Sequence, residues 1–149
     1  MENNMNAGAC LRSSLASLQC ELVAERALAN PDGITWLQYD VLFQLSKEKQ
    51  IVPSSLSAVL GISRVKLSKA LKELKESGYI VQAPNPLDGR ELLTSITEKG
   101  EQTLRNISAK HESLYQAAVA ALQEEDLLIF VGLAEKLSNA LRAKRLEQS

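Results

Sequence analysis

The chain has 149 residues, with 17 basic and 18 acidic side chains and a hydrophobic content of 45%, a balance typical of a soluble domain with or without helical extensions. Its longest apolar run, residues 127–134, is far too short to span a bilayer, and its N-terminus lacks the basic and apolar regions of a secretory signal. We therefore expect a cytoplasmic protein without a membrane partner.

Few residues are available for catalysis or metal binding. His111 is the only histidine, no CxxC motif occurs, and the sequence contains no glycine-rich phosphate loop or nucleophile elbow. We expect no metal, no cofactor and no enzymatic activity.

The first predicted helix covers residues 8–29, which lack proline and repeat apolar residues at helical spacing. These apolar residues fall in two rows on nearly opposite sides of the helix. One row holds Leu11, Leu15, Leu18 and Leu22, and the other holds Ala9, Ala16, Cys20, Val23 and Ala27. A surface helix normally has one apolar stripe, so two stripes predict a helix packed between neighbours, one of which can belong to a second subunit.

Three short helices follow the turn at residues 30–33. Thr35 is placed to cap a helix that extends to about Leu45, and residues 50–52 have an extended pattern. Pro53 then opens a short helix, which Gly61 ends. Ser63 caps the next helix, residues 64–77, and a glycine stops it at residue 78. A short helix, a tight turn and a second helix together describe a helix-turn-helix.

A hairpin and two long helices complete the predicted fold. Residues 79–82 and 91–97 are predicted strands, with the turn-rich segment NPLDG between them. From Glu98 one apolar stripe extends through His111 to Ala118, which predicts one long helix, and Glu124–Asp126 open the last helix. The expected fold class is mainly α (α+β), a winged helix-turn-helix.

Positive charge is concentrated between residues 61 and 90, which hold six basic and three acidic residues in a nearly neutral chain. Leucines form one row of the 64–77 helix, and Lys66, Lys69 and Lys72 lie on the opposite side. Val65 lies among these lysines, where it could contact a thymine methyl group in a major groove. Arg90, at the hairpin tip, has the reach to enter a minor groove, and Asp88 can orient it through a bidentate pair.

Each of these features also has a simpler interpretation. The lysines could belong to a solvated face, with the pairs Lys69–Glu73 and Lys72–Glu76 stabilising the helix, and Arg90 could be an ordinary loop residue. The combination of a basic face, a helix-turn-helix and a wing favours DNA binding. The alternative is a winged-helix module that binds another protein and no DNA.

Residues 56–80 (LSAVLGISRVKLSKALKELKESGYI) and 88–100 (DGRELLTSITEKG) resemble the MarR family of transcriptional regulators. The wing pattern of that family appears here as Asp88, Arg90, Ile96-Thr97 and Gly100. The resemblance implies a winged DNA-binding lobe, residues 31–97, between helical dimerisation regions at residues 1–30 and 98–149. It also implies a homodimer that binds pseudo-palindromic duplex DNA, in most members as a repressor relieved by a small molecule or by oxidation.

The resemblance implies major-groove contacts from residues 64–72 and a minor-groove contact from the wing. The predicted DNA-binding residues are Ser54, Ser63, Arg64, Val65, Lys66, Ser68, Lys69, Lys72, Asp88 and Arg90.

The sequence leaves open two ways in which such a repressor could be released from DNA. Cys10 is expected near the start of the first helix, where peroxide-sensing members of the family place a reactive cysteine, and a helix N-terminus favours thiol reactivity. A free cysteine is also commonly an inert hydrophobic residue. The other mode is a small anionic or aromatic effector, for which Arg12, Trp36 and Tyr39 are the candidate pocket residues.

Overall fold

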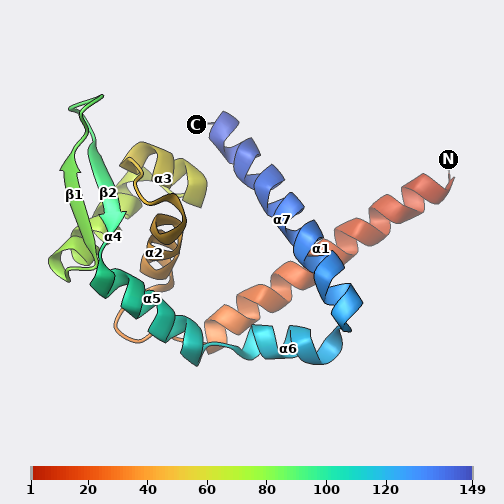
Figure 1. Cartoon of the computed structure of the whole chain (residues 1–149). Coiled ribbons are helices and arrows are strands. Elements are labelled where there is room, and N and C mark those ends of the chain that lie inside the picture. The colour runs from red at the N-terminus through yellow and green to blue at the C-terminus, as the bar shows by residue number, and fades with distance from the viewer. Residues whose placement is uncertain (1, 149) are drawn as a thin grey trace. The chain divides into compact units, whose positions relative to one another are not determined.

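The computed structural model describes residues 2–148, and the side chains of residues 6–148. The chain divides into two compact units, Met1–Asn30 and Pro31–Ser149. The first unit consists of helix α1 (Glu2–Leu28), which begins before the predicted residue 8 (Figure 1). Both of its predicted apolar rows are exposed to solvent in the single chain.

The second unit holds the remaining elements (Figure 1). They are α2 (Trp36–Glu48), α3 (Pro53–Leu60), α4 (Arg64–Glu76), β1 (Ile80–Pro84), β2 (Leu92–Ile96), α5 (Glu98–Lys110), α6 (Ser113–Ala121) and α7 (Glu124–Glu147). The mainly helical fold with one antiparallel hairpin after α4 confirms the predicted winged helix-turn-helix.

Local side-chain chemistry fixes the boundaries of the helix-turn-helix. Thr35 accepts the Gln38 N–H at 3.1 Å, and the Gln38 side chain accepts the Thr35 N–H at 3.0 Å, which forms a capping box at the start of α2. Ser63 caps α4 by accepting the Lys66 N–H at 3.2 Å. Gly61 ends α3 with φ at 65°, a left-handed conformation that glycine adopts without a steric penalty. These contacts confirm the predicted starts and the predicted turn.

The wing is tied to the start of the helix-turn-helix by a third extended segment. Strands β1 and β2 pair antiparallel from Ile80–Ile96 to Pro84–Leu92. Ile51 and Thr94 exchange both backbone hydrogen bonds, at 3.0 and 2.9 Å, so the predicted extended segment before α3 adds one bridge to this sheet.

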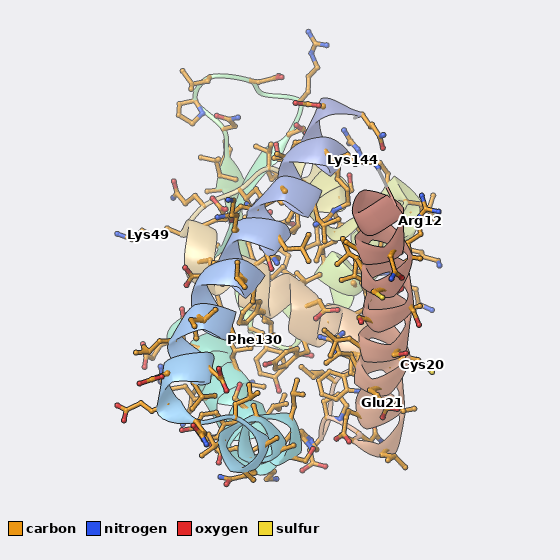
Figure 2. The ribbon with its side chains drawn as sticks, turned by 90° about the vertical axis from the view of Figure 1, so that its right-hand side faces the viewer. Arg12, Cys20, Glu21, Lys49, Phe130 and Lys144 are labelled. Carbon is orange, nitrogen blue, oxygen red and sulfur yellow. The ribbon has the colours of Figure 1, made fainter. Side chains whose placement is uncertain are left out.

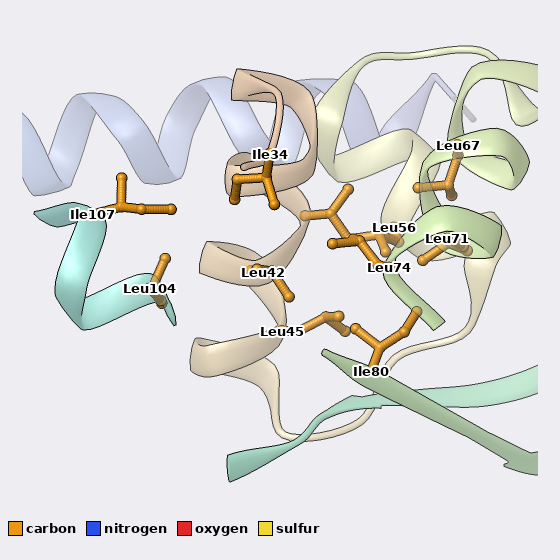
Figure 3. Close-up of a cluster of buried hydrophobic side chains, with 11 residues drawn as sticks. Ile34, Leu42, Leu45, Leu56, Leu67, Leu71, Leu74, Ile80, Leu104 and Ile107 are labelled. Carbon is orange, nitrogen blue, oxygen red and sulfur yellow. The ribbon is translucent and has the colours of Figure 1, made fainter. Parts of the chain in front are cut away.

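The hydrophobic core lies between the elements of the winged lobe and α5, which packs against them (Figure 3). Helix α4 contributes its predicted leucine row, which packs with residues of α2, α3, β1 and α5. The buried cluster is Ile34, Val41, Leu42, Leu45, Leu56, Leu67, Leu71, Leu74, Ile80, Leu104 and Ile107. Among the described residues, α6 and α7 contain no buried side chain. Within residues 2–148, none of the helices combines the length and the apolar character needed to cross a membrane.

The prediction of one continuous helix from Glu98 to Ala118 is wrong. Helix α5 ends at Lys110, and α6 begins only at Ser113. His111 leaves helical geometry with φ at −116° and ψ at 54°, and its ring packs against Trp36 with a centroid separation of 5.8 Å. Lys110 donates to Asp32 at 2.6 Å and holds the pKa of that carboxyl below its ordinary value. Two contacts therefore accompany the break between α5 and α6. Lys110 binds Asp32, which precedes α2, and His111 packs on Trp36, the first residue of α2.

Gly100 provides a test of the close packing of α5 against the wing. A Cβ atom at this position would lie 2.3 Å from the Tyr79 carbonyl oxygen and 2.6 Å from Ile96 Cγ1. We expect Gly100→Ala to lower the free energy of unfolding by about 1–3 kcal/mol or more, measured by urea denaturation. Gly89→Ala is the matched control, because a Cβ there meets nothing within 4 Å. Equal midpoints for wild type and Gly100→Ala would contradict this packing.

Candidate nucleic-acid interface

The outer face of α4 carries exposed lysines. Lys66, Lys69 and Lys72 are solvent-exposed and lie opposite the buried leucine row. Within residues 2–148, none of these three side chains forms an ion pair. The described residues therefore supply no carboxylate partner for these three ammonium groups.

The predicted pairs Lys69–Glu73 and Lys72–Glu76 are absent from the described residues. Glu73 instead accepts a hydrogen bond of 2.5 Å from Gln38 Nε2. Gln38 is buried, so its amide needs a partner, and Glu73 is within reach across the contact between α2 and α4. This contact uses the carboxylate that would otherwise face Lys69.

Two further residues of α4 present groups to the same surface. Val65 is 81% exposed, although apolar side chains of its size are usually covered. Ser68 is also exposed, one turn from Lys72. Neither residue contributes to the buried core, so their side chains are available for contacts outside the chain.

Glu91 connects the two helices of the motif to the wing. Its carboxylate accepts the Ser54 N–H at 3.0 Å and the Ser54 hydroxyl at 2.6 Å, and it pairs with Arg64 Nη1 at 3.3 Å. The starts of α3 and α4 are therefore held against the beginning of β2. The hydroxyl of Ser54 is engaged within the chain, whereas the Arg64 side chain remains 62% exposed. Glu91 carries no signal in the sequence, because residues 54 and 64 approach it only in the folded chain.

The wing tip presents an arginine to solvent. Arg90 has a side chain that is 93% exposed. Asp88 Oδ1 accepts the Arg90 N–H at 3.0 Å and lies 3.7 Å from Arg90 Nε, so the predicted bidentate pair is wrong and a single oxygen makes both contacts. Because Oδ1 is already bonded to the backbone, Asp88 orders the turn more than it holds the guanidinium. Asn85 Oδ1 orders the same tip by accepting the Leu87 N–H at 3.0 Å.

An aromatic cluster lies at the junction of α2 and α5. Trp36 packs edge-to-face on Tyr39 with a centroid separation of 5.3 Å, and the Tyr39 hydroxyl lies 3.1 Å from Ser108 Oγ. The Nε2 atom of His111 is buried and has no hydrogen-bond partner among the described residues. Two of the three predicted pocket residues, Trp36 and Tyr39, therefore lie together.

The third predicted pocket residue and the candidate sensor belong to α1. Figure 2 shows Arg12 and Cys20 on that helix. Cys10 is exposed and its sulfur lies 3.9 Å from Asn6 Oδ1. Since α1 begins at Glu2, Cys10 lies beyond the first turn and the predicted position near the helix start is wrong. No group of three or more His, Cys, Asp or Glu side chains suited to a metal ion occurs in the described part of the chain.

Known proteins with similar sequences are transcriptional regulators. A helix-turn-helix transcriptional regulator of Mycobacterium bovis is 26% identical over 142 residues, which cover 95% of this chain and 87% of the relative. The transcriptional repressor MprA of Escherichia coli is 29% identical over 116 residues, which cover 74% of this chain and 66% of the repressor.

Solved structures share the fold. The multiple antibiotic resistance repressor MarR superposes with a TM-score of 0.70 at 24% identity, covering 85% of this chain and 92% of that one. A MarR variant from E. coli in complex with operator DNA gives a TM-score of 0.64 at 24% identity, covering 82% of this chain and 91% of that one. The MarR family profile matches residues 32–91, which hold α2, α3, α4, the wing tip and the Glu91 contact. The chain therefore matches the MarR family of transcriptional regulators over residues 32–91 and shares the fold of MarR.

Proposed function

We propose that this protein is a homodimeric, sequence-specific repressor of transcription that binds pseudo-palindromic duplex DNA. The observation that carries the proposal is the lysine face of α4, which is exposed and has no internal ion pairs among the described residues. The names of its relatives, which include transcriptional repressors, support this function.

Helix α4 enters the major groove in this proposal. Lys66, Lys69 and Lys72 contact phosphates, because an exposed ammonium group that displaces counterions from DNA gains affinity without losing an internal partner. Val65 contacts the methyl group of a thymine, which gives its exposed apolar side chain a favourable environment. Ser63, Arg64 and Ser68 lie at the same end of the helix, where a phosphate can also meet free backbone amides.

The wing reaches the neighbouring minor groove. Arg90 extends from a turn that Asp88 and Asn85 order, so its backbone is fixed before DNA binds. A cationic side chain on a narrow hairpin suits the enhanced negative potential of a narrow A·T-rich minor groove. Glu91 supports both contacts, since it fixes the wing relative to α4.

A second copy of the chain covers the exposed apolar helices. Leu128, Ile129 and Leu133 of α7 are each more than half exposed, and α1 and α6 carry further exposed leucines. Exposed large apolar side chains gathered along a helix in this way mark an interface. Two-fold pairing would place two α4 helices about 34–36 Å apart, which is one turn of DNA.

The alternative is a winged-helix module that binds protein and no DNA. Such a module has no need for an exposed lysine face without internal partners. A gel-shift experiment with genomic fragments distinguishes the two functions, because only the DNA-binding protein retards duplex fragments.

Release by a small aromatic or anionic effector is favoured over release by oxidation. Trp36, Tyr39 and His111 offer stacking surfaces beside a buried imidazole nitrogen without a partner among the described residues. Cys10 lies past the first helical turn of α1, and so outside the helix start where the family resemblance places a reactive cysteine.

Lys69→Ala should weaken operator binding about three- to tenfold and lower the salt-dependence slope by about one, because one phosphate contact is lost. The measurement is a fluorescence-anisotropy titration at several salt concentrations. Lys75→Ala is the matched control, since this exposed lysine lies on the same helix but outside the proposed contact face. Wild-type affinity and slope for Lys69→Ala would remove this face from the interface.

Arg90→Ala should weaken binding about five- to thirtyfold for operators with A·T-rich flanks, and less for G·C-rich flanks, because the narrow minor groove supplies the attraction. Competition binding with the two operators measures this difference. Arg105→Ala on α5 removes an exposed arginine away from the wing and serves as the control. An unchanged operator preference would exclude the wing from recognition.

Peroxide treatment should leave operator affinity unchanged, because Cys10 lacks the environment of a reactive thiol. The measurement is operator binding before and after treatment, with mass spectrometry of the protein. If wild type loses affinity and Cys10→Ser keeps it, oxidation is the means of release.

A further inference from the structure

Two arginines at the C-terminal end of α7 bind the helix-turn-helix. Arg142 Nη1 donates to Gln44 Oε1 at 3.4 Å, and Arg142 Nη2 donates to and forms an ion pair with Glu48. Arg145 Nε donates to the Val59 backbone carbonyl at 3.0 Å. Because these arginines are three residues apart, they lie on the same side of α7, from which they contact α2 and α3.

Both contacts are made at helix C-termini. Glu48 is the last residue of α2, and Val59 lies in the last turn of α3, where carbonyls have no partner within the helix. A guanidinium group satisfies such a carbonyl and interacts favourably with the negative end of the helix dipole. Arg145 therefore matches the end of α3 by charge as well as by hydrogen bonding, and Arg142 pairs with the carboxylate side chain at the end of α2.

The contacts are more confined than ordinary surface ion pairs. The Arg142 side chain is only 29% exposed. Arg145 packs against the turn after α3, since its Cδ atom lies 3.4 Å from the position of a Cβ added to Gly61. Because a guanidinium group is planar, holding it in this way fixes the direction of its hydrogen bonds as well as their length.

The covalent connection between the winged lobe and α7 contains a break. Helices α5 and α6 are separated by His111 and Glu112, and α6 contains no buried side chain among the described residues. Because of this break, α5 and α6 fix the orientation of the winged lobe relative to α7 less firmly than one continuous helix would. The arginine contacts supply a second connection, from α7 directly to α2 and α3.

We propose that Arg142 and Arg145 are positioning residues that fix the winged lobe on α7 and thereby set the separation of the two α4 helices in the dimer. This inference rests on the proposed dimer, in which the preceding part of α7, with Leu133 and Leu137, supplies the subunit contact. One helix would then carry the dimer contact and hold the DNA-reading lobe at a defined distance from it. Such preorganisation raises affinity for one half-site spacing.

The separation of the two α4 helices in the dimer can be measured directly, without DNA, by electron spin resonance distance spectroscopy. A spin label is attached through Ser68→Cys in a background of Cys10→Ser and Cys20→Ser, so that each subunit carries one label on α4. We expect one narrow distance distribution, and a clearly broadened one after Arg142→Ala with Arg145→Ala. Lys144→Ala is the matched control, because this exposed lysine lies on the same turn of α7 (Figure 2).

Operator binding by the unlabelled proteins gives a second readout. The double arginine variant should bind the preferred operator about tenfold more weakly, and its affinity should depend less on half-site spacing than that of wild type. Arg142→Glu should have a similar effect, and adding Glu48→Arg should restore both affinity and spacing preference. Restoration by the reversed pair distinguishes positioning from a general loss of folding.

The possible results are distinct. Equal distance distributions and equal spacing preferences for wild type and the double arginine variant would overturn the positioning role. A loss of binding that the reversed pair does not restore would overturn the role of the Arg142–Glu48 contact. The absence of any distance between labels in the wild-type background would overturn the dimer on which the inference rests, and failure of wild type to bind duplex DNA would overturn the proposed function instead.

Discussion

Burial of the α4 leucine row is the constraint on which the rest of the winged lobe depends. Leu67, Leu71 and Leu74 fill the space between α2, α3 and β1, and each buried leucine stabilises the fold by roughly 1.5–3 kcal/mol relative to an exposed one. Because a helix has 3.6 residues per turn, burying this row forces the lysines to the opposite side. The packing of the core thus determines which chemical groups the lobe presents to its surroundings.

The polar contacts around that core preserve the charge of the lysine face. Gln38 donates to Glu73, which forms no ion pair with Lys69 among the described residues, and Glu91 binds Ser54 and Arg64 where the wing begins. Glu73 and Glu91 therefore connect elements within the lobe. The lysines remain without internal partners in the described chain, which is the state expected of groups that bind phosphate.

The sequence predicted the elements whose signals are local. Thr35, Ser63 and Gly61 mark helix boundaries through contacts with residues only a few positions away, and the leucine period alone identified the buried face of α4. The extended conformation around Ile51 was also predicted, but its pairing with Thr94 was not.

Features that depend on distant residues could not be predicted in this way. The apolar stripe continues through His111, so periodicity gave no sign of the break that accompanies packing against Trp36. The partners of Glu73 and Glu91 come from other elements, and the contact of Arg142 with α2 joins residues 94 positions apart. The Lys69–Glu73 pair of the solvated-face interpretation is absent for the same reason, since Glu73 accepts a long-range hydrogen bond from Gln38.

Hydroxyl-radical footprinting on a fragment selected from genomic DNA tests most directly whether this lobe reads DNA as one half of a symmetric pair. If the lysine faces of two subunits occupy successive major grooves, protection should appear as two symmetric patches about one helical turn apart, with further protection in the flanking minor grooves. A single unsymmetric patch of protection, or no protection at protein concentrations that saturate a gel shift, would contradict DNA reading by a symmetric pair of lobes.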